Sequence, residues 1–177
     1  MPVTVFGRPS AGENASYYDN YISKVPPGDL VVIMSDQVTE LDALLRPLSE
    51  AAAAYRYAPG KWSVKQVVGH LIDTERVFSF RAIAFARNEV ARLPSFDQDA
   101  WVAAADYDER SLVSLIDEWQ AVRRASIAMA RGLSEAALLR RGVASDVEFT
   151  VRAALCILPG HVQYHIEHLR SHSRVPS

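Results

Sequence analysis

Apolar side chains recur every three or four residues in four long stretches of the chain, which is the spacing of one face of a helix. The first predicted helix begins at Asp29 and should end or kink at about Arg46, because Pro47 cannot continue it. Residues 51–54, all alanine, predict a short helical piece after it. The apolar face of the first helix consists of Leu30, Met34, Val38, Leu41, Leu45 and Leu48.

The second predicted helix runs from Val64 to about Arg87. Ser63 is followed three residues later by Gln66, which has the form of a capping box at a helix start. Gly69 is the one residue in this stretch that disfavours a helix, and the stretch holds no proline. The segment is therefore predicted to be a long core helix.

Two further helices follow a loop through residues 94–99. The third should run from near Asp108 to Gly132, where a glycine suits a left-handed C-terminal cap. Thr150 can cap the fourth, and Pro159 predicts a bend within it, because proline removes one hydrogen bond of the helix. Trp101, in the connection between the second and third helices, is expected to close one end of the core.

No segment alternates with the period of a strand, so the pattern predicts an all-α fold, a four-helix bundle. Residues 1–28 differ from the rest because glycine and proline interrupt them repeatedly. They predict an irregular N-terminal arm laid over the surface, with Tyr17, Tyr18 and Tyr21 fixing it there. Residues 29–177 are predicted to form the bundle domain.

Composition agrees with a single soluble domain. The chain has 177 residues, 49% of them hydrophobic, and a formal charge of -2 spread over mixed acidic and basic positions. This charge forms no basic stripe, so nucleic acid is not an expected partner. No apolar run approaches the roughly 20 residues of a membrane span, and the first twenty residues lack a signal peptide pattern. A cytoplasmic protein is expected, with its single cysteine, Cys156, buried and reduced.

The histidines carry the candidate chemistry. Four of the five lie at steps of four, three and four residues, within about 60° on one helix face: His161, His165, His168 and His172. Two histidines at i and i+4 can bind one metal ion, and the remaining histidine, His70, lies on the otherwise apolar face of another helix. Burying such imidazoles unpaired costs about 1 to 3 kcal/mol each, which a metal ion would remove.

The other polar groups near these histidines have simpler interpretations. His168 and His172 belong to a last helical turn, where the helix dipole favours them, and solvation is the preferred interpretation. Asp73 or Glu167 could accept a hydrogen bond from an imidazole or serve as a fourth ligand, although a surface charge is favoured. Glu75 is expected to face away from the site.

Three stretches of the chain resemble the DinB/YfiT-like superfamily of metal-dependent four-helix-bundle proteins: KWSVKQVVGHLIDTERVFSFRAIAFAR, FDQDAWV and GHVQYHIEHLR. The resemblance covers residues 30–172. It implies one divalent metal ion, nickel or zinc, on the residues that match the family's ligands, His70, His161 and His165. It also implies a homodimer, and a thiol-dependent S-transferase or isomerase that uses low-molecular-weight thiols.

The chain departs from the family pattern at two positions beside these ligands. Tyr164 stands where many members have another histidine, and His168 stands where a glutamine is frequent. Both departures leave the three ligands intact, and both put a transferred substrate specificity in question.

Three neutral histidines leave coordination positions open, as in catalytic zinc sites. A divalent ion held this way can lower the pKa of a bound water or thiol. The first hypothesis is therefore a metal-dependent enzyme of the thiol S-transferase type that acts on a small molecule, and a metal-dependent hydrolase is the alternative. Thr74, Arg81, Tyr164 and His168 are expected to line its pocket, with Trp62 as a further candidate. Arg81 could orient an anionic substrate, although a surface ion pair is favoured for it.

Two hypotheses without catalysis remain open. In the first, the metal is structural or sensory, the protein is a binding module or scaffold, and His168 or a carboxylate fills the fourth coordination position. In the second, no metal binds, and the histidine stripe is an interface that responds to pH near 6.

Overall fold

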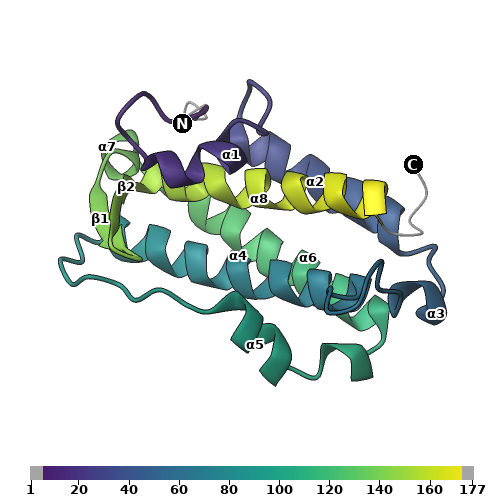
Figure 1. Cartoon of the computed structure of the whole chain (residues 1–177). Helices are drawn as coiled ribbons and strands as arrows, with labels where there is room; N and C mark the ends of the chain where they lie inside the picture. The colour runs from purple at the N-terminus through teal and green to yellow at the C-terminus, as the bar shows by residue number, and fades with distance from the viewer. Residues whose placement is uncertain (1–5, 173–177) are drawn as a thin grey trace.

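Four long helices form the body of the molecule, as the computed structural model shows for the residues it describes, 6–172. They are α2 (Leu30–Leu45), α4 (Val64–Ala86), α6 (Leu112–Arg131) and α8 (Val151–His172). Figure 1 shows them lying side by side along the length of the molecule. Helix α4 packs against α6 and α8, and α2 packs against the same two helices. The predicted all-α four-helix bundle is confirmed.

Side-chain caps fix where these helices begin. The Asp29 carboxylate accepts a hydrogen bond from the Val31 amide at the start of α2. Ser63 and Gln66 form the predicted capping box at the start of α4. The Thr150 hydroxyl accepts from an amide in the first turn of α8. These three starts agree with the sequence because capping needs only local residues.

Shorter elements connect the long helices. They are η1 (Ser16–Tyr18), α1 (Asp19–Ile22), α3 (Glu50–Ala53), α5 (Gln98–Ala104), η2 (Tyr107–Glu109) and α7 (Glu135–Leu138). The third long helix therefore begins at Leu112, after η2, rather than near Asp108. Gly132 ends it with φ of -85°, so the expected left-handed cap is wrong. Helix α8 continues through Pro159, and the bend expected there stays a prediction.

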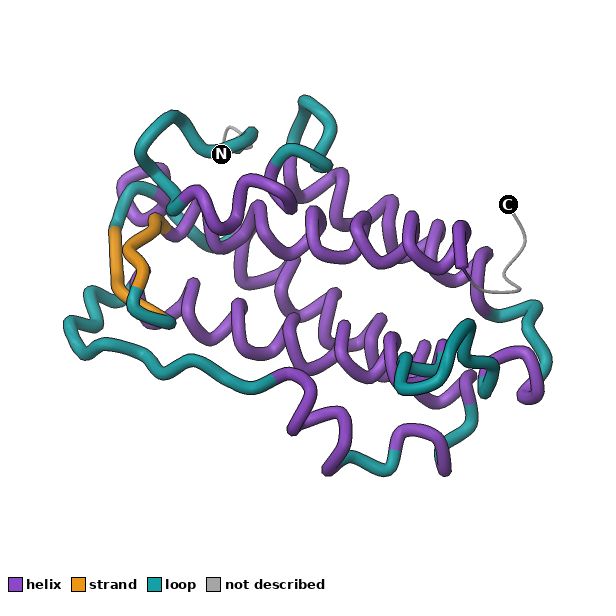
Figure 2. Tube along the Cα trace, in the orientation of Figure 1, coloured by secondary structure: helices purple, strands orange, loops and turns teal. Residues whose placement is uncertain are grey.

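A β-hairpin closes one end of the bundle, where the sequence predicted no strand (Figure 2). Strands β1 (Arg141–Ala144) and β2 (Val147–Thr150) pair antiparallel. Ser145 and Asp146 make the turn with positive φ of 52° and 60°. Each strand has only four residues, which is too short for a clear alternating pattern.

The N-terminal arm contributes to the core instead of lying over the surface as expected. Phe6, Tyr18, Ile22 and Val25 are buried in the same apolar cluster as the hairpin end of α4 and α8. Figure 1 shows α1 lying along α8. The chain can approach α8 closely there because a glycine, Gly160, faces the arm.

Trp101 does not close the core, contrary to expectation. Its side chain is 44% exposed on α5, where Val102 is the residue that faces inward. Figure 2 shows α5 outside the four long helices.

The predicted burial of the single cysteine is confirmed. Cys156 is inaccessible, and burial raises the pKa of its thiol to about 12. None of the helices among residues 6–172 is long and apolar enough to cross a membrane.

The core consists of two apolar clusters with a polar layer between them. One cluster contains the hairpin end of the bundle, and the other contains the end where α2 finishes and α4 begins. Each long helix contributes a buried polar residue at the junction: Gln37 from α2, Glu75 from α4, Arg123 from α6 and His161 from α8. The histidine cluster lies in this layer.

Candidate metal centre

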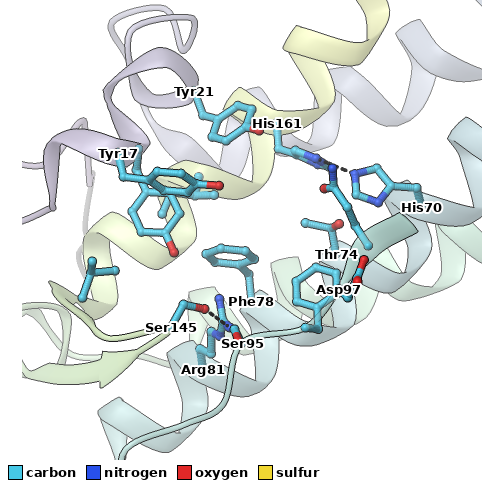
Figure 3. Close-up of a pocket in the computed structure, with 15 residues that line it drawn as sticks. Tyr17, Tyr21, His70, Thr74, Phe78, Arg81, Ser95, Asp97, Ser145 and His161 are labelled. Carbon is cyan, nitrogen blue, oxygen red and sulfur yellow. Dashed lines mark hydrogen bonds between the residues drawn. The ribbon is translucent and has the colours of Figure 1, made fainter. Parts of the chain in front are cut away.

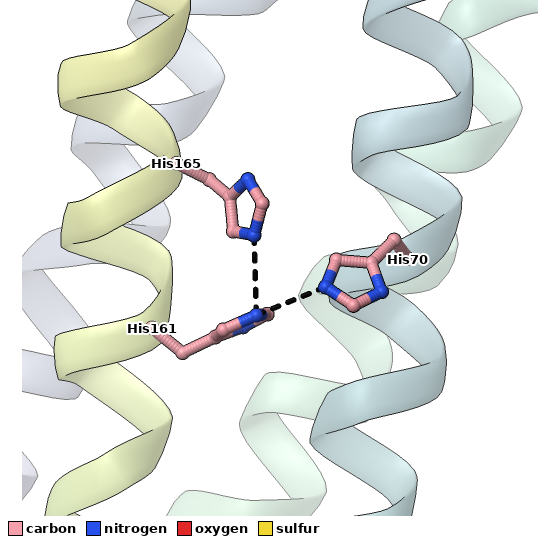
Figure 4. Close-up of side chains that lie close together, drawn as sticks. All are labelled: His70, His161 and His165. Carbon is pink, nitrogen blue, oxygen red and sulfur yellow. Dashed lines mark hydrogen bonds between the residues drawn. The ribbon is translucent and has the colours of Figure 1, made fainter. Parts of the chain in front are cut away.

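Three histidines from two helices meet in the polar layer (Figure 4). His70 comes from α4, and His161 and His165 lie one turn apart on α8. The Nε2 atom of His161 is 3.0 Å from Nε2 of His70 and 3.1 Å from Nε2 of His165. The three residues are only 2%, 5% and 8% exposed, in sequence order. They form a group whose nitrogens all lie within 4.8 Å of one another.

These nitrogens cannot satisfy one another by hydrogen bonding. A neutral imidazole nitrogen carries either one hydrogen or one lone pair, so Nε2 of His161 cannot pair fully with both neighbours. Nδ1 of His165 is also buried, without a hydrogen-bond partner among residues 6–172. No carboxylate or thiol among the described residues joins the group. A cation that accepts the lone pairs of the three Nε2 atoms fits this arrangement, because it would compensate these converging nitrogens.

Burial keeps these imidazoles neutral. It lowers the pKa of His70 to about 4. It also lowers the pKa values of His161 and His165 well below their usual value, with a smaller effect from the neighbouring histidines. Neutral imidazole is the form that binds a metal ion, so the lone pairs are available at neutral pH.

Aromatic rings surround the three histidines. The Trp62 ring lies 4.8 Å from the His70 ring, centroid to centroid. The Tyr21 ring lies 5.3 Å from that of His161, and the Tyr164 ring lies 5.2 Å from that of His165. Tyr21 was not among the residues predicted for the site, because its position depends on the path of the arm. One aromatic ring therefore packs against each of the three histidines.

A buried ion pair supports α8 one turn before His161, and it too was missed by sequence reasoning. Arg123 lies 2.9 Å from the Glu75 carboxylate and donates a hydrogen bond to the carbonyl of Leu158. Gln37 accepts from Arg123 and donates to the carbonyl of Pro159. Glu75 forms this ion pair and does not belong to the histidine group. A signal was present, since Arg123 lies on the inner stripe of its helix between Trp119 and Ile127.

The acids considered as further ligands lie elsewhere. Asp73 accepts a hydrogen bond from the Tyr107 hydroxyl at 2.6 Å. Glu167 is exposed and forms an ion pair with Lys24. Neither belongs to the histidine group. The side chain of His172 lies outside the described residues, so the prediction for it stays a prediction.

A first cavity, of about 510 Å³, opens on the hairpin side of the cluster (Figure 3). His70, Thr74 and Arg81 line it from α4, and His161 lines it from α8. Arg81 is 2% exposed, so the surface ion pair favoured for it is wrong. The hydroxyl of Thr74 is buried and has no hydrogen-bond partner in the part of the chain that the structure describes.

A second cavity of similar volume lies on the other side of the cluster. Its lining includes Trp62, Tyr164, His165 and His168. The four residues predicted for one pocket are therefore divided, with Thr74 and Arg81 in the first cavity and the other two in the second. The expectation of one shared pocket fails because α4 and α8 present different faces to the two sides of the cluster.

Comparisons with known proteins agree with this architecture. The family model described as "DinB superfamily" matches residues 34–169. A Bacillus licheniformis protein named "Putative metal-dependent hydrolase" is 25% identical over 134 residues, which is 72% of this chain and 73% of the relative. YfiT from Bacillus subtilis, described as a probable metal-dependent hydrolase with an unusual four-helix bundle topology, superimposes with a TM-score of 0.70. That structural match has 20% identity and covers 94% of this chain and 91% of the other.

Proposed function

The chain belongs to the DinB superfamily, and from this premise we propose that it is a metal-dependent hydrolase of a small molecule. His70, His161 and His165 are the proposed ligands of one divalent ion. Nickel and zinc are the proposed ions, because imidazole nitrogen suits both. The names of the relatives from the two Bacillus species support hydrolysis as the reaction class.

One observation carries this proposal: three buried, neutral imidazole nitrogens converge, and they cannot satisfy one another. When bound, a divalent ion would act as a Lewis acid and lower the pKa of a water molecule that it binds. Histidines supply no negative charge, so the ion would keep its full positive charge for this task. Coordination positions beyond three would remain for water and substrate.

The residues around the cluster would bind the substrate and control the access of water. Thr74 lies one turn after His70 and presents an unpaired hydroxyl to the first cavity. This hydroxyl can donate a hydrogen bond to a substrate oxygen or accept one from a water molecule. Tyr21 and Trp62 would shield the ligands from bulk solvent, which strengthens electrostatic effects within the site.

Two other expectations have weaker support. A thiol S-transferase was the first hypothesis, yet neither relative is named as a transferase. A closed structural metal site would need a fourth protein ligand, and His168 lines the second cavity without joining the histidine group. Cavities on both sides of the cluster favour an accessible, reactive ion.

The test starts from the metal content of the purified, untagged protein after reconstitution with zinc and with nickel. We expect about one equivalent in the parent and in a His168→Ala control, and little in a folded His161→Ala/His165→Ala variant. Hydrolysis of a panel of small esters and amides is then expected from the metal-loaded parent and not from His161→Ala/His165→Ala. A parallel assay with a small thiol and an electrophile tests the transferase alternative. Negligible metal in all three proteins would overturn the proposal.

A further inference from the structure

Arg81 is a buried cation that has no carboxylate partner among the residues that the structure describes. Its Nη2 donates to the carbonyl of Pro94 at 2.9 Å and to the hydroxyl of Ser145 at 2.8 Å. The Tyr18 hydroxyl also interacts with it, and its guanidinium carbon lies 4.8 Å from the centre of the Phe78 ring. All of these neighbours are neutral, so nothing on the described part of the chain neutralises the charge.

A comparison with Arg123, another deeply buried arginine, shows the compensating charge that Arg81 lacks. Arg123 is inaccessible as well, but it lies 2.9 Å from the buried carboxylate of Glu75. Removing a charged group from water is expensive unless an opposite charge compensates it. Arg123 has this compensation within the protein, and Arg81 lacks it. Arg81 differs in a second way, because it lines a cavity that an external anion could enter.

The shape of the first cavity connects Arg81 with the histidines. Figure 3 shows Arg81 at one end and His70 with His161 at the other, with Phe78 between them. His70 and Arg81 are eleven residues apart on α4, which places their backbones about 16 Å apart along the helix axis. The cavity volume of about 510 Å³ is that of a site for a molecule of ordinary drug size.

We propose that the substrate carries an oxyanion, a carboxylate or a phosphate, which Arg81 binds at the end of the first cavity away from the histidines. The middle of this substrate is apolar, because it passes the ring of Phe78 and the tyrosines of the arm. Its hydrolysable bond lies at the histidine end. This inference rests on the proposed function for the reaction, but the binding of the oxyanion does not require catalysis.

A purely structural role would not explain why the side chain at position 81 is charged. Its hydrogen bonds do connect the loop at Pro94 with the hairpin turn at Ser145. A neutral donor could form these two bonds without the cost of burying a charge. Asp97, the acid in the same lining, is exposed, and its carboxylate accepts from two amides at the start of α5. A planar guanidinium at the end of a cavity is suited to a carboxylate or phosphate.

The test measures binding by titration calorimetry to protein stripped of metal by a chelator, so that an oxyanion cannot bind to the ion instead. The probes are 6-phenylhexanoate, 6-phenylhexyl phosphate and the neutral 6-phenylhexanamide. We expect at least one oxyanion to bind about tenfold or more tightly than the amide, as for charge-assisted hydrogen bonds. Arg81→Met should remove this preference and leave the affinity for the amide unchanged. Arg76→Met, an exposed arginine of the same helix, serves as the matched control.

Each outcome decides the matter. The parent protein alone can overturn the inference, even if Arg81→Met fails to fold. It does so if it binds neither oxyanion, or if it binds the amide as tightly as both oxyanions. A preference that survives in folded Arg81→Met would overturn it as well. Failure of the metal analysis would leave these binding results standing, so the two proposals fail separately.

Discussion

At the scale of single residues, the ion pair of Glu75 and Arg123 determines how the polar layer is built. Both side chains are inaccessible, and the partners of Arg123, which are Glu75, Gln37 and Leu158, lie on three other helices. One carboxylate oxygen of Glu75 and Nε of Arg123 have no hydrogen-bond partner among the described residues. The pair therefore depends strongly on its own attraction, and the loss of either member leaves the other as an uncompensated buried charge.

Arg123→Met should lower the free energy of unfolding by about 3 to 5 kcal/mol, because it leaves the buried Glu75 carboxylate without its partner. Adding Glu75→Leu to this variant should recover part of the loss. Arg76→Met is the control, since Arg76 pairs with Glu118 at the surface with 51% of its side chain exposed and should cost less than about 1 kcal/mol. Urea denaturation measures all three variants. Equal losses in the two single variants would contradict the argument.

The neutral histidines predict how the stability of the metal-free protein depends on pH. The pKa of His70 is about 4 in the folded protein, so below pH 6.5 the unfolded chain binds more protons than the folded one. Stability should therefore fall as the pH falls from 7 to 5.5, by up to about 1.4 kcal/mol per pH unit for each histidine.

Urea denaturation at several pH values, compared between variants, isolates this effect. His70→Gln should reduce the slope, and His168→Gln, outside the cluster, should retain most of it. Comparing the variants with the parent cancels the contributions of other titrating groups to the slope. One such group is Asp73, whose pKa is raised by burial. A slope in His70→Gln as steep as in the parent would show that His70 is not held neutral.

At the scale of elements, the features that the sequence predicted correctly are those that depend on local residues alone. The starts of α2, α4 and α8 follow from Asp29, Ser63 and Thr150, each of which caps its helix through its own side chain. Spacing on one helix also predicted that His161 and His165 share a face, which is a property of helix geometry alone. Such features need no knowledge of distant neighbours.

What the sequence did not predict depends on contacts between distant elements. The arm was expected on the surface because glycine and proline interrupt it repeatedly, yet Tyr18 and Ile22 are buried by α4, α8 and the hairpin. The hairpin itself requires Gly142, where an added Cβ would lie 2.0 Å from the ring of Phe85. The division of the pocket candidates between two cavities likewise depends on where the arm and the loop before α5 pass.

Gly160→Ala should displace α1 from α8. An added Cβ at Gly160 would lie 2.2 Å from the carbonyl oxygen of Tyr21, and this obstacle is backbone that cannot rotate away. We expect a loss of about 1 to 3 kcal/mol in stability and faster hydrogen exchange of the amides in residues 19–25. The control is Gly132→Ala, whose Cβ would meet ordinary contacts only. Unchanged exchange in Gly160→Ala would mean that α1 does not depend on this close approach.

At the scale of the whole molecule, the proposed metal site bridges segments that are far apart in the sequence. His70 and His161 are 91 residues apart, and the arm covers their cluster from a third region of the chain. The cluster also lies where the two apolar cores meet. An ion bound there would connect α4 with α8 at the least apolar level of the bundle. Binding should therefore stabilise the entire fold and not only the site.

Metal should raise the thermal midpoint of the parent protein by an amount that grows with the logarithm of the ratio of metal concentration to dissociation constant. An ion at 100 times this constant adds about 2.7 kcal/mol, which corresponds to roughly 5 to 10 °C for a chain of this size. His168→Ala should show the same shift, and His161→Ala/His165→Ala should show none. Scanning calorimetry with zinc, with nickel and with chelator measures this. An ion stabilises the folded state only through the ligands that bind it. A shift that persists in the double variant would therefore show that the ion binds outside the histidine cluster.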